Sequence, residues 1–217
     1  MITGSGGTIG GGLSEKIISL LPEELILVDI SEQGLFQIMN RISNYKKKFN
    51  LKTNIYFYLN SVSDFDEMSL LFQKHKINYV FHTAAFKHVH IIQENLLSAV
   101  KNNVLSTKIL CDLSMKHNVD KFLFVSSDKA VRPTNILGAC KRVAEHYVRA
   151  SNNRDKSKTI FFTVRFGNVL GSSGSAFNTF NEKIKKKESI QITDINMTRY
   201  FMTLDQAVSL LLKTQEI

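Results

Sequence analysis

Hydrophobic positions along the chain follow two patterns in turn. Short runs of β-branched and aromatic residues predict strands, and longer stretches with apolar residues at three- and four-residue spacing predict helices. The predicted strands are Leu25–Asp29, Ile55–Tyr58, Tyr79–Thr83, Phe122–Ser126 and Ile160–Arg165. The predicted helices are Ser14–Leu21, Gly34–Phe49, Asp66–His75, Leu97–Asn118, Lys141–Asn152 and Leu204–Lys213. Strands that alternate with helices are typical of an α/β fold with a doubly wound parallel sheet.

Both ends of the chain are short for such a fold. A glycine-rich segment begins at Gly4 and leaves only Met1 to Thr3 for the first strand. In the usual strand order this strand is central, and its loss would leave unpaired backbone groups in the core. We therefore expect a fragment that is truncated in its first strand and in its C-terminal region.

The glycine-rich segment has the spacing of a phosphate-binding loop. Glycines stand at positions 4, 7 and 10, directly before a helical stretch. Glycine lets the backbone turn tightly and approach a pyrophosphate, whose charge a helix N-terminus stabilises. Asp29 ends the next predicted strand, 19 residues after Gly10, close to the offset at which an acid binds the ribose hydroxyls of NAD. A carboxylate there would repel the 2′-phosphate of NADP, so the pattern favours NAD. The alternative is that Asp29 only caps a turn or helix.

A second polar cluster follows the strand at Phe122–Ser126. Its sequence is Ser126-Ser127-Asp128-Lys129-Ala130-Val131, at the carboxyl end of a strand, where open α/β sheets place their sites. A neighbouring acid and amine can be two parts of a proton-transfer apparatus. They can equally be a turn with a surface ion pair, and composition alone does not decide between the two.

The composition narrows the class of protein. Hydrophobic residues make up 43% and charged residues 22% of the chain, as in ordinary globular proteins, and no apolar run approaches the roughly 20 residues of a membrane span. The chain does not begin like a signal peptide, and Cys111 and Cys140 form no close-spaced pair. We therefore expect a cytoplasmic protein. His82 and His88 lack the spacing of metal ligands, so no metal is expected.

The net charge of +9 is concentrated partly in Lys46–Lys48 and Lys185–Lys187. Such runs are usually solvated helix faces. Two alternatives are the steering of an anionic substrate and contact with an acidic membrane surface. Nucleic-acid binding is not expected, because no recognisable module interleaves these lysines with exposed aromatic residues.

Over essentially its whole length the chain resembles CapD-type polysaccharide biosynthesis proteins, which are extended short-chain dehydrogenases. The motifs that carry the resemblance are His82–Val89 (HTAAFKHV), Lys101–Val104 (KNNV), Ser126–Asn135 (SSDKAVRPTN), Gly138–Arg142 (GACKR), Val164–Ser175 (VRFGNVLGSSGS) and Met197–Thr203 (MTRYFMT). The resemblance implies one NAD-binding Rossmann domain over residues 1–217, with 168–217 forming part of a substrate region. It also implies a homo-oligomer and, in the most similar branch, a membrane anchor ahead of the present sequence.

The activity that the resemblance implies is that of a lyase, a UDP-N-acetylhexosamine 4,6-dehydratase. Oxidation of the sugar's 4-hydroxyl makes the C5 hydrogen acidic, the 6-hydroxyl leaves as water, and NAD is regenerated within one turnover. The family roles fall on Lys129 as the C5 base, Asp128 as the acid for the leaving hydroxyl, and Ser127 as the group that holds the 4-oxygen. Lys141 would contact the nicotinamide ribose.

Further site residues follow from the same motifs. The residues expected at NAD are Gly4, Gly7, Thr8, Ile9, Gly10, Asp29, Ser61, Val62, Ala84, Ala85, Asn103 and Lys141. Lys87, Asn168 and Arg199 are expected to bind the substrate, because ammonium and guanidinium groups suit phosphate and sugar oxygens.

One position departs from the wider enzyme class. Short-chain dehydrogenases carry a tyrosine four residues before the active-site lysine, and this chain has Leu137 there. The membrane-anchored branch resembles this chain in having an apolar residue at that position, and Asp128 is the candidate to take the 4-hydroxyl proton instead. The alternatives are a UDP-sugar 4-epimerase, which depends on that tyrosine, and a non-catalytic NAD-binding domain.

Overall fold

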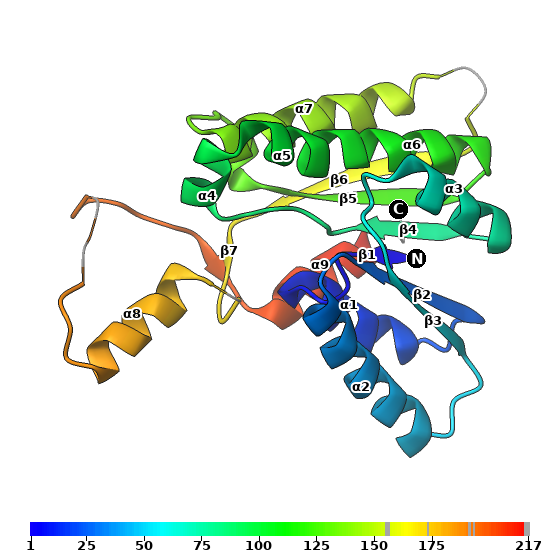
Figure 1. Ribbon diagram of the computed structural model, residues 1–217, viewed down its shortest axis with the longest axis horizontal. Helices are drawn as coiled ribbons and strands as arrows, with labels where there is room; N and C mark the ends of the chain where they lie inside the picture. The colour runs from blue at the N-terminus through cyan, green and yellow to red at the C-terminus, as the bar shows by residue number, and fades with distance from the viewer. Residues whose placement is uncertain (155–156, 173, 191, 193, 215–217) are drawn as a thin grey trace.

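A six-stranded parallel sheet forms the centre of the molecule (Figure 1). The computed structural model describes residues 1–154, 157–172, 174–190, 192 and 194–214. The strands are β1 (Ile2–Thr3), β2 (Glu24–Asp29), β3 (Asn54–Leu59), β4 (Tyr79–His82), β5 (Lys121–Ser127), β6 (Ile160–Phe166), β7 (Asn168–Val169) and β8 (Phe201–Met202). The order across the sheet is β3-β2-β1-β4-β5-β6, which is the order of the Rossmann fold. The predicted fold class is therefore confirmed.

The helices run between the strands and cover both faces of the sheet. They are α1 (Thr8–Ile18), α2 (Glu32–Lys48), α3 (Phe65–Lys74), α4 (Val89–Glu94), α5 (Leu96–Val100), α6 (Ser106–Lys116), α7 (Ile136–Ser151), α8 (Ala176–Lys185) and α9 (Leu204–Lys213). A π-helical turn, η1 (Lys101–Leu105), joins α5 to α6, and a 3-10 turn, η2 (Asp128–Ala130), follows β5. No helix among the described residues is long and apolar enough to cross a membrane.

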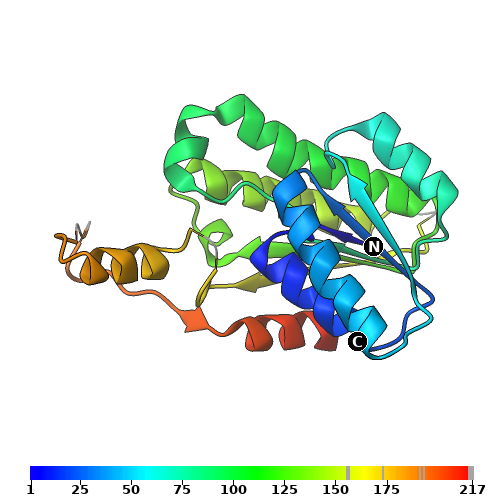
Figure 2. The same cartoon turned by 60° about the horizontal axis from the view of Figure 1, so that its bottom comes forward.

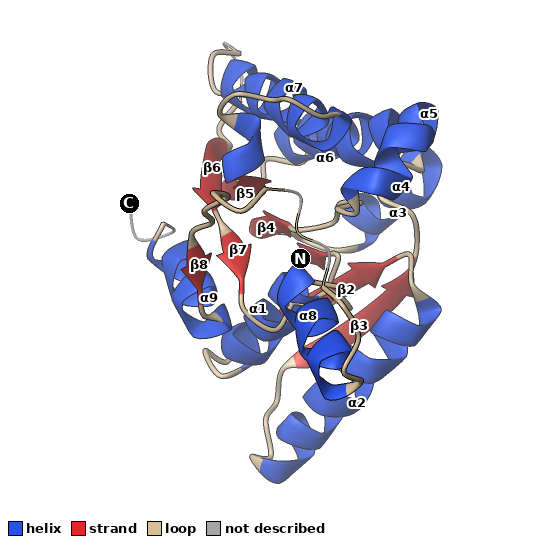
Figure 3. Cartoon of the chain, turned by 90° about the vertical axis from the view of Figure 1, so that its left-hand side faces the viewer, coloured by secondary structure: helices blue, strands red, loops and turns tan. Residues whose placement is uncertain are grey.

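Two hydrophobic cores lie on the two faces of the sheet. Side chains from α3, α6 and α7 pack on one face, and side chains from α1, α2 and α9 pack on the other (Figures 1 and 3). Successive strand residues point to opposite faces, so in β5 Phe122 and Phe124 enter the first core while Leu123 and Val125 enter the second. Figure 2 shows α9 beside α1, which closes the second layer.

The first strand is short, as the sequence predicted, but its two residues pair on both sides. Ile2 pairs with Leu27 on one side and Phe81 on the other, and Ile2 is fully buried. The backbone oxygen of Met1 also accepts a hydrogen bond from Phe81 N at 2.9 Å. Two paired residues therefore suffice to hold the centre of the sheet together and to place the glycine loop at its edge.

Two helices begin earlier than the apolar pattern predicted. Helix α1 starts at Thr8 rather than Ser14, and α7 starts at Ile136 rather than Lys141. For α7 the cause is a cap, because the Asn135 side chain accepts a hydrogen bond from Gly138 N at 2.9 Å. Both helices consequently point their N-terminal ends towards the carboxyl edge of the sheet.

A small second sheet was not predicted. Strands β7 and β8 pair in parallel, with Asn168 opposite Phe201 and Val169 opposite Met202. Helix α8 follows β7 and extends away from the main body (Figure 1). The second sheet therefore carries Asn168 to the same edge at which β5 ends.

Candidate active site

The glycine loop lies between β1 and α1 and is packed closely against the end of β4. Gly4 has a φ of +70°, and a Cβ on it would lie 2.6 Å from Ala84 N. A Cβ on Gly10 would collide with the carbonyl oxygen of Gly4. Side chains are therefore excluded at both positions, and Gly4, Gly7, Thr8, Ile9 and Gly10 line a cavity of about 1100 Å³. The N-terminal end of α1 faces this cavity, which suits an anionic group.

Asp29 ends β2 beside the glycine loop. Its two carboxylate oxygens accept hydrogen bonds from Gly6 N and from Ser31 N, each at 2.8 Å. Asp29 thus caps a turn and ties down the glycine loop, but each carboxylate oxygen can accept a second bond. It lines a smaller cavity of about 290 Å³. Gly4, Gly7 and Ala85 border both cavities, which are therefore contiguous.

The remaining residues expected at the cofactor divide into two groups. Val62, Ala84 and Ala85 line the smaller cavity. Ser61 is not among its lining residues, and its hydroxyl lies 2.9 Å from the Ser63 hydroxyl.

Asn103 does not line either cavity but holds the loop that does. It lies in the π-helical turn η1, is almost fully buried, and exchanges hydrogen bonds of 2.8 and 2.9 Å with the backbone N and O of Phe86. Asn103 therefore fixes the backbone of Phe86, which borders both cavities.

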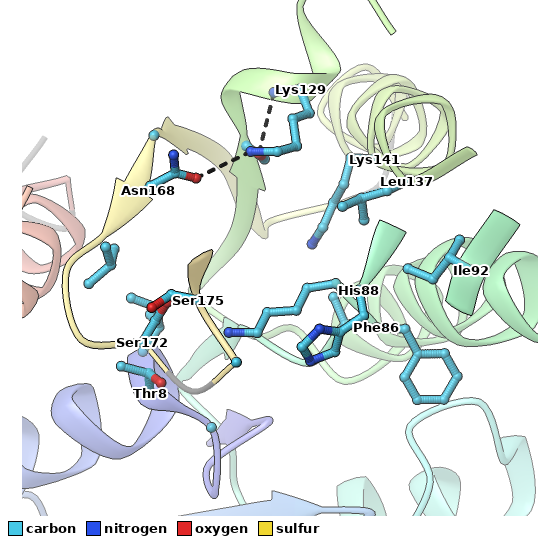
Figure 4. Close-up of a pocket in the computed structure, with 18 of the residues that line it drawn as sticks. Thr8, Phe86, His88, Ile92, Lys129, Leu137, Lys141, Asn168, Ser172 and Ser175 are labelled. Carbon is cyan, nitrogen blue, oxygen red and sulfur yellow. Dashed lines mark hydrogen bonds between the residues drawn. The ribbon is translucent and has the colours of Figure 1, made fainter. Parts of the chain in front are cut away.

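The second polar cluster forms a connected unit at the end of β5. The Ser127 hydroxyl donates to Asp128 Oδ1 at 2.9 Å, and Lys129 Nζ lies 3.1 Å from the same oxygen. Lys129 Nζ is also 3.5 Å from Asn168 Oδ1 on β7 (Figure 4). Ser127, Lys129 and Asn168 line the large cavity, whereas Asp128 is not among its lining residues and reaches it through its hydrogen bond with Ser127.

The charge of Asp128 follows from this geometry. Burial opposes ionisation of its carboxyl group, but hydrogen bonds from Lys129 and Ser127 outweigh burial and lower the pKa of Asp128 below its ordinary value. Asp128 is therefore a carboxylate at neutral pH and can accept a proton before it can donate one.

Lys141 enters the cavity from the first turns of α7. Its Nζ donates to Val125 O at 2.8 Å and lies 4.6 Å from the centre of the Phe124 ring. Only 6% of the residue is exposed, and burial lowers the pKa of its ammonium group to about 8. Leu137, one turn earlier, is buried and projects into the same cavity (Figure 4). No proton-transfer group stands at that position.

The three residues expected at the substrate come from separate elements and border the same cavity. Lys87 follows β4, Asn168 lies on β7, and Arg199 precedes β8. Arg199 is exposed, and its guanidinium donates to Thr198 O at 2.8 Å. The fold thus brings together groups that are more than 100 residues apart in sequence.

Several lining residues were not predicted as site residues. Thr83 ends the β4 segment and donates to Thr3 O at 2.7 Å. His88 borders the cavity next to Gly174, while Ser172 and Ser175 lie on the wall with Thr8 (Figure 4). The signal that could have found Thr83 is its position at the carboxyl end of a central strand. Ser173, in the same serine-rich motif, lies outside the described residues.

His82 stands apart from the cavities. Its ring nitrogens lie 2.8 Å from the Thr3 hydroxyl and 3.1 Å from the Thr107 hydroxyl, and burial lowers its pKa to about 3. Among the described residues no three histidine, cysteine, aspartate or glutamate side chains are grouped as metal ligands.

Comparisons with known proteins agree with this architecture. The chain is 36% identical to the capsular polysaccharide biosynthesis protein CapD of Staphylococcus aureus, over 98% of this chain and 35% of CapD. Among solved structures it is similar to Pen from Bacillus thuringiensis, with a TM-score of 0.90 and 32% identity over 100% of this chain and 64% of Pen. It is also similar to the UDP-glucose 4-epimerase of Thermotoga maritima, with a TM-score of 0.83 and 25% identity over 99% of this chain and 72% of the epimerase.

The chain thus spans little more than a third of the length of CapD. The family described as "Polysaccharide biosynthesis protein" matches residues 1–217. The motifs, the strand order and these similarities agree, and the chain belongs to this polysaccharide biosynthesis family.

Proposed function

We propose that this chain carries the active site of an NAD-dependent nucleotide-sugar 4,6-dehydratase that acts on a UDP-N-acetylhexosamine. The observation that carries the proposal is the Ser127–Asp128–Lys129 cluster, held beside Lys141 at one cavity. A 4-epimerase needs no such acid–amine pair, because its reaction does not remove a C5 proton or a hydroxyl group.

The glycine loop and Asp29 fit a dinucleotide. The backbone of Gly4 and Gly10 leaves no room for side chains, the N-terminal end of α1 suits the pyrophosphate, and Asp29 has lone pairs for ribose hydroxyls. When bound, NAD would supply the acceptor for the hydride removed from C4 and the hydride that later reduces C6. Lys141 would contribute positive charge close to the reacting carbon.

The residues at the cavity can accept and donate each proton that the proposed reaction moves. The Ser127 hydroxyl, which lines the cavity and donates to Asp128, can relay the proton of the sugar's 4-hydroxyl to the Asp128 carboxylate. The protonated Asp128 would then return this proton, through the Ser127 hydroxyl, to the departing 6-hydroxyl, which leaves as water. The Lys129 side chain would take the C5 proton and later give it back to C5. Asp128 therefore replaces the tyrosine that Leu137 cannot supply.

The binding groups suit a sugar diphosphate. Lys87 and Arg199 offer cationic donors to phosphate oxygens, and the Asn168 amide lies within 3.5 Å of Lys129. The segment from residue 168 onwards, with β7 and β8, would act as the substrate region. The membership of a polysaccharide biosynthesis family supports a role in building a surface glycan.

The test is mass spectrometry of UDP-N-acetylglucosamine after incubation with the protein and NAD. Loss of one water from the sugar nucleotide is expected. Asp128→Asn and Lys129→Met should each lower the rate by about 10²–10⁴-fold, which is the usual contribution of a proton-transfer group. Lys47→Met, on the exposed surface of α2, is the matched control and should leave the rate unchanged.

Other products would identify the alternatives. An unchanged mass together with formation of the 4-epimer would establish the epimerase, to which the similar Thermotoga protein gives some weight. Binding of NAD without any sugar product would establish a non-catalytic domain. Either result would overturn the dehydratase proposal.

A further inference from the structure

The edge of the sheet opposite the cavity combines lysines with exposed apolar side chains. The loops that follow α1 and α2 lie side by side there, because Thr53 Oγ1 donates to Pro22 O at 2.7 Å and Asn54 N donates to Glu23 O at 2.9 Å. We define the basic pole as the residues Lys16, Leu20, Leu21, Lys46, Lys47, Lys48, Phe49 and Lys52.

The apolar part of the basic pole is not covered by other elements. Leu20 is 63% exposed, Leu21 is 64% exposed and Phe49 is 50% exposed. Leu20 and Leu21 follow the end of α1, and Phe49 caps the end of α2. Single exposed hydrophobic residues are common on protein surfaces. Adjacent exposed hydrophobic residues on a lysine-rich surface are a feature of proteins that bind membranes.

The charges of the basic pole are not neutralised locally. Among the described residues, none of its five lysines takes part in an ion pair. The nearby acids are engaged elsewhere, since Glu15 pairs with Arg41 at 3.1 Å and Glu24 with His75 at 3.1 Å. Glu23 is exposed in the loop after α1 and leaves the pole strongly positive. One lysine in the last turn is enough to interact favourably with the helix dipole. The three lysines in the last turn of α2 are therefore more than its dipole accounts for.

We propose that the basic pole docks on an anionic lipid surface. Lysines near a membrane are attracted by acidic headgroups, and Leu20, Leu21 and Phe49 can enter the region between headgroups and acyl chains. The aliphatic Leu20 and Leu21 favour this occupant over a nucleic acid, which would select several aromatic stacking platforms or a groove-binding element. The proposal depends on none of the active-site residues.

The experiment measures co-sedimentation of the protein with vesicles of equal parts phosphatidylglycerol and phosphatidylcholine, against vesicles of phosphatidylcholine alone. Binding to the anionic vesicles is expected at low salt. It should be lost in 1 M salt, where the screening length falls to about 3 Å. The triple variant Lys46→Gln, Lys47→Gln, Lys48→Gln should bind on the order of 100-fold more weakly, from the usual contribution of each lysine near such a surface.

A matched variant separates the basic pole from net charge. Lys185→Gln, Lys186→Gln, Lys187→Gln removes the same charge at the end of α8, at the opposite end of the molecule (Figure 1), and should bind as the unchanged protein does. Leu20→Ser with Leu21→Ser should weaken binding while leaving the melting temperature unchanged, because these side chains are 63% and 64% exposed.

Three results would overturn the proposal. They are an equal loss of binding in the two triple variants, no loss of binding in the Leu20 and Leu21 variant, and binding to single- or double-stranded nucleic acid in preference to anionic vesicles. Dehydration of the sugar nucleotide should be the same in the unchanged protein and in the Lys46, Lys47, Lys48 triple variant, whose residues lie outside the proposed active site and substrate region. Failure of the docking proposal and failure of the dehydratase proposal are therefore distinguishable.

Discussion

Replacement of Lys141 by methionine is expected to stabilise the fold at neutral pH while it abolishes activity. Burial lowers the pKa of Lys141 from 10.5 to about 8, a difference of about 2.5 units. At 1.36 kcal/mol per unit, the buried charge costs about 3 kcal/mol at pH values below 8. Methionine also loses the hydrogen bond that even the neutral amine would donate to Val125 O, which costs about 2 kcal/mol at a buried site. The net gain for Lys141→Met at pH 7 is therefore about 1 kcal/mol.

The dependence on pH is the sharper part of this prediction. Between pH 8 and 10.5 the unfolded chain holds the proton of Lys141 more tightly than the folded chain does, so the stability of the unchanged protein rises with pH. The methionine variant has no such gain in stability with pH, because methionine does not titrate. Its advantage should therefore fall by about 3 kcal/mol between pH 7 and pH 10.5 and change sign on the way.

Urea unfolding followed by circular dichroism, repeated across this pH range, measures both quantities. Lys47→Met, at an exposed position of α2, is the control and should follow the unchanged protein at every pH. A constant difference between the Lys141→Met and unchanged proteins from pH 7 to 10.5 would refute the reasoning. It would mean that the Lys141 ammonium is not desolvated in the folded state.

Two further substitutions test the geometry around the cavity. Gly4→Ala should cost about 2–4 kcal/mol in urea unfolding, because it adds a clash with the Ala84 backbone to the strain of a positive φ. Gly171 has the same φ of +70°, but a Cβ on it would have no atom within 4 Å, so Gly171→Ala should lower the free energy of unfolding by only about 1–2 kcal/mol. Equal losses of stability in the two alanine variants would show that the clash with Ala84 is absent. Glu145 forms a bidentate ion pair with Arg165, with hydrogen bonds of 2.7 and 2.5 Å. Glu145→Gln breaks this pair and should lower the free energy of unfolding by about 2 kcal/mol, a value reduced because the arginine side chain is 38% exposed to solvent. The control is Arg142→Gln, which should change the free energy of unfolding by less than about 0.5 kcal/mol, because the Arg142 side chain is 40% exposed and lies 3.6 Å from Glu145. Thermal unfolding of both variants compares the two pairs. A similar loss of stability in each would show that the pair with Arg165 is no stronger than the pair with Arg142.

The strands that sequence could predict are those with a continuous run of apolar side chains. Strands β2 to β6 begin and end within one or two residues of their predicted bounds, because three to five successive apolar or β-branched residues dominate each one. Strands β1, β7 and β8 have two residues each, too few for a periodic pattern. They are stabilised by pairing with distant segments, such as Ile2 between Leu27 and Phe81.

The start of α1 shows a similar override of local preference. Gly10, Gly11 and Gly12 disfavour a helix, and the apolar spacing predicted its start only at Ser14. The burial of Leu13 and Ile18 in the core stabilises the helix through these glycines. Tertiary packing therefore determines where α1 begins, and the N-terminal end of α1 is the candidate anion site. The spacing of apolar residues alone could not predict this start.

For the candidate site, strand ends and motifs located the residues but not their orientations. The positions of Ser127, Lys129 and Lys141 around one cavity follow from the end of β5 and the start of α7. The hydrogen bond between Ser127 and Asp128 depends on the turn η2. The hydrogen bonds of Asn103 with the Phe86 backbone depend on the turn η1. Such turns place side chains by backbone angles that the pattern of apolar residues does not encode.

The polarity of a parallel sheet connects the cavity with the basic pole. All strands of the main sheet run in one direction, so their carboxyl ends and the N-terminal ends of the following helices share one edge. The helix C-terminal ends, with Lys16 and Lys48, lie at the other edge. A chain docked through the basic pole would therefore present its cavity away from the lipid, open to a dissolved nucleotide sugar. Because the two regions share no partner, the effects of Lys141→Met and of the basic-pole substitutions on stability should add.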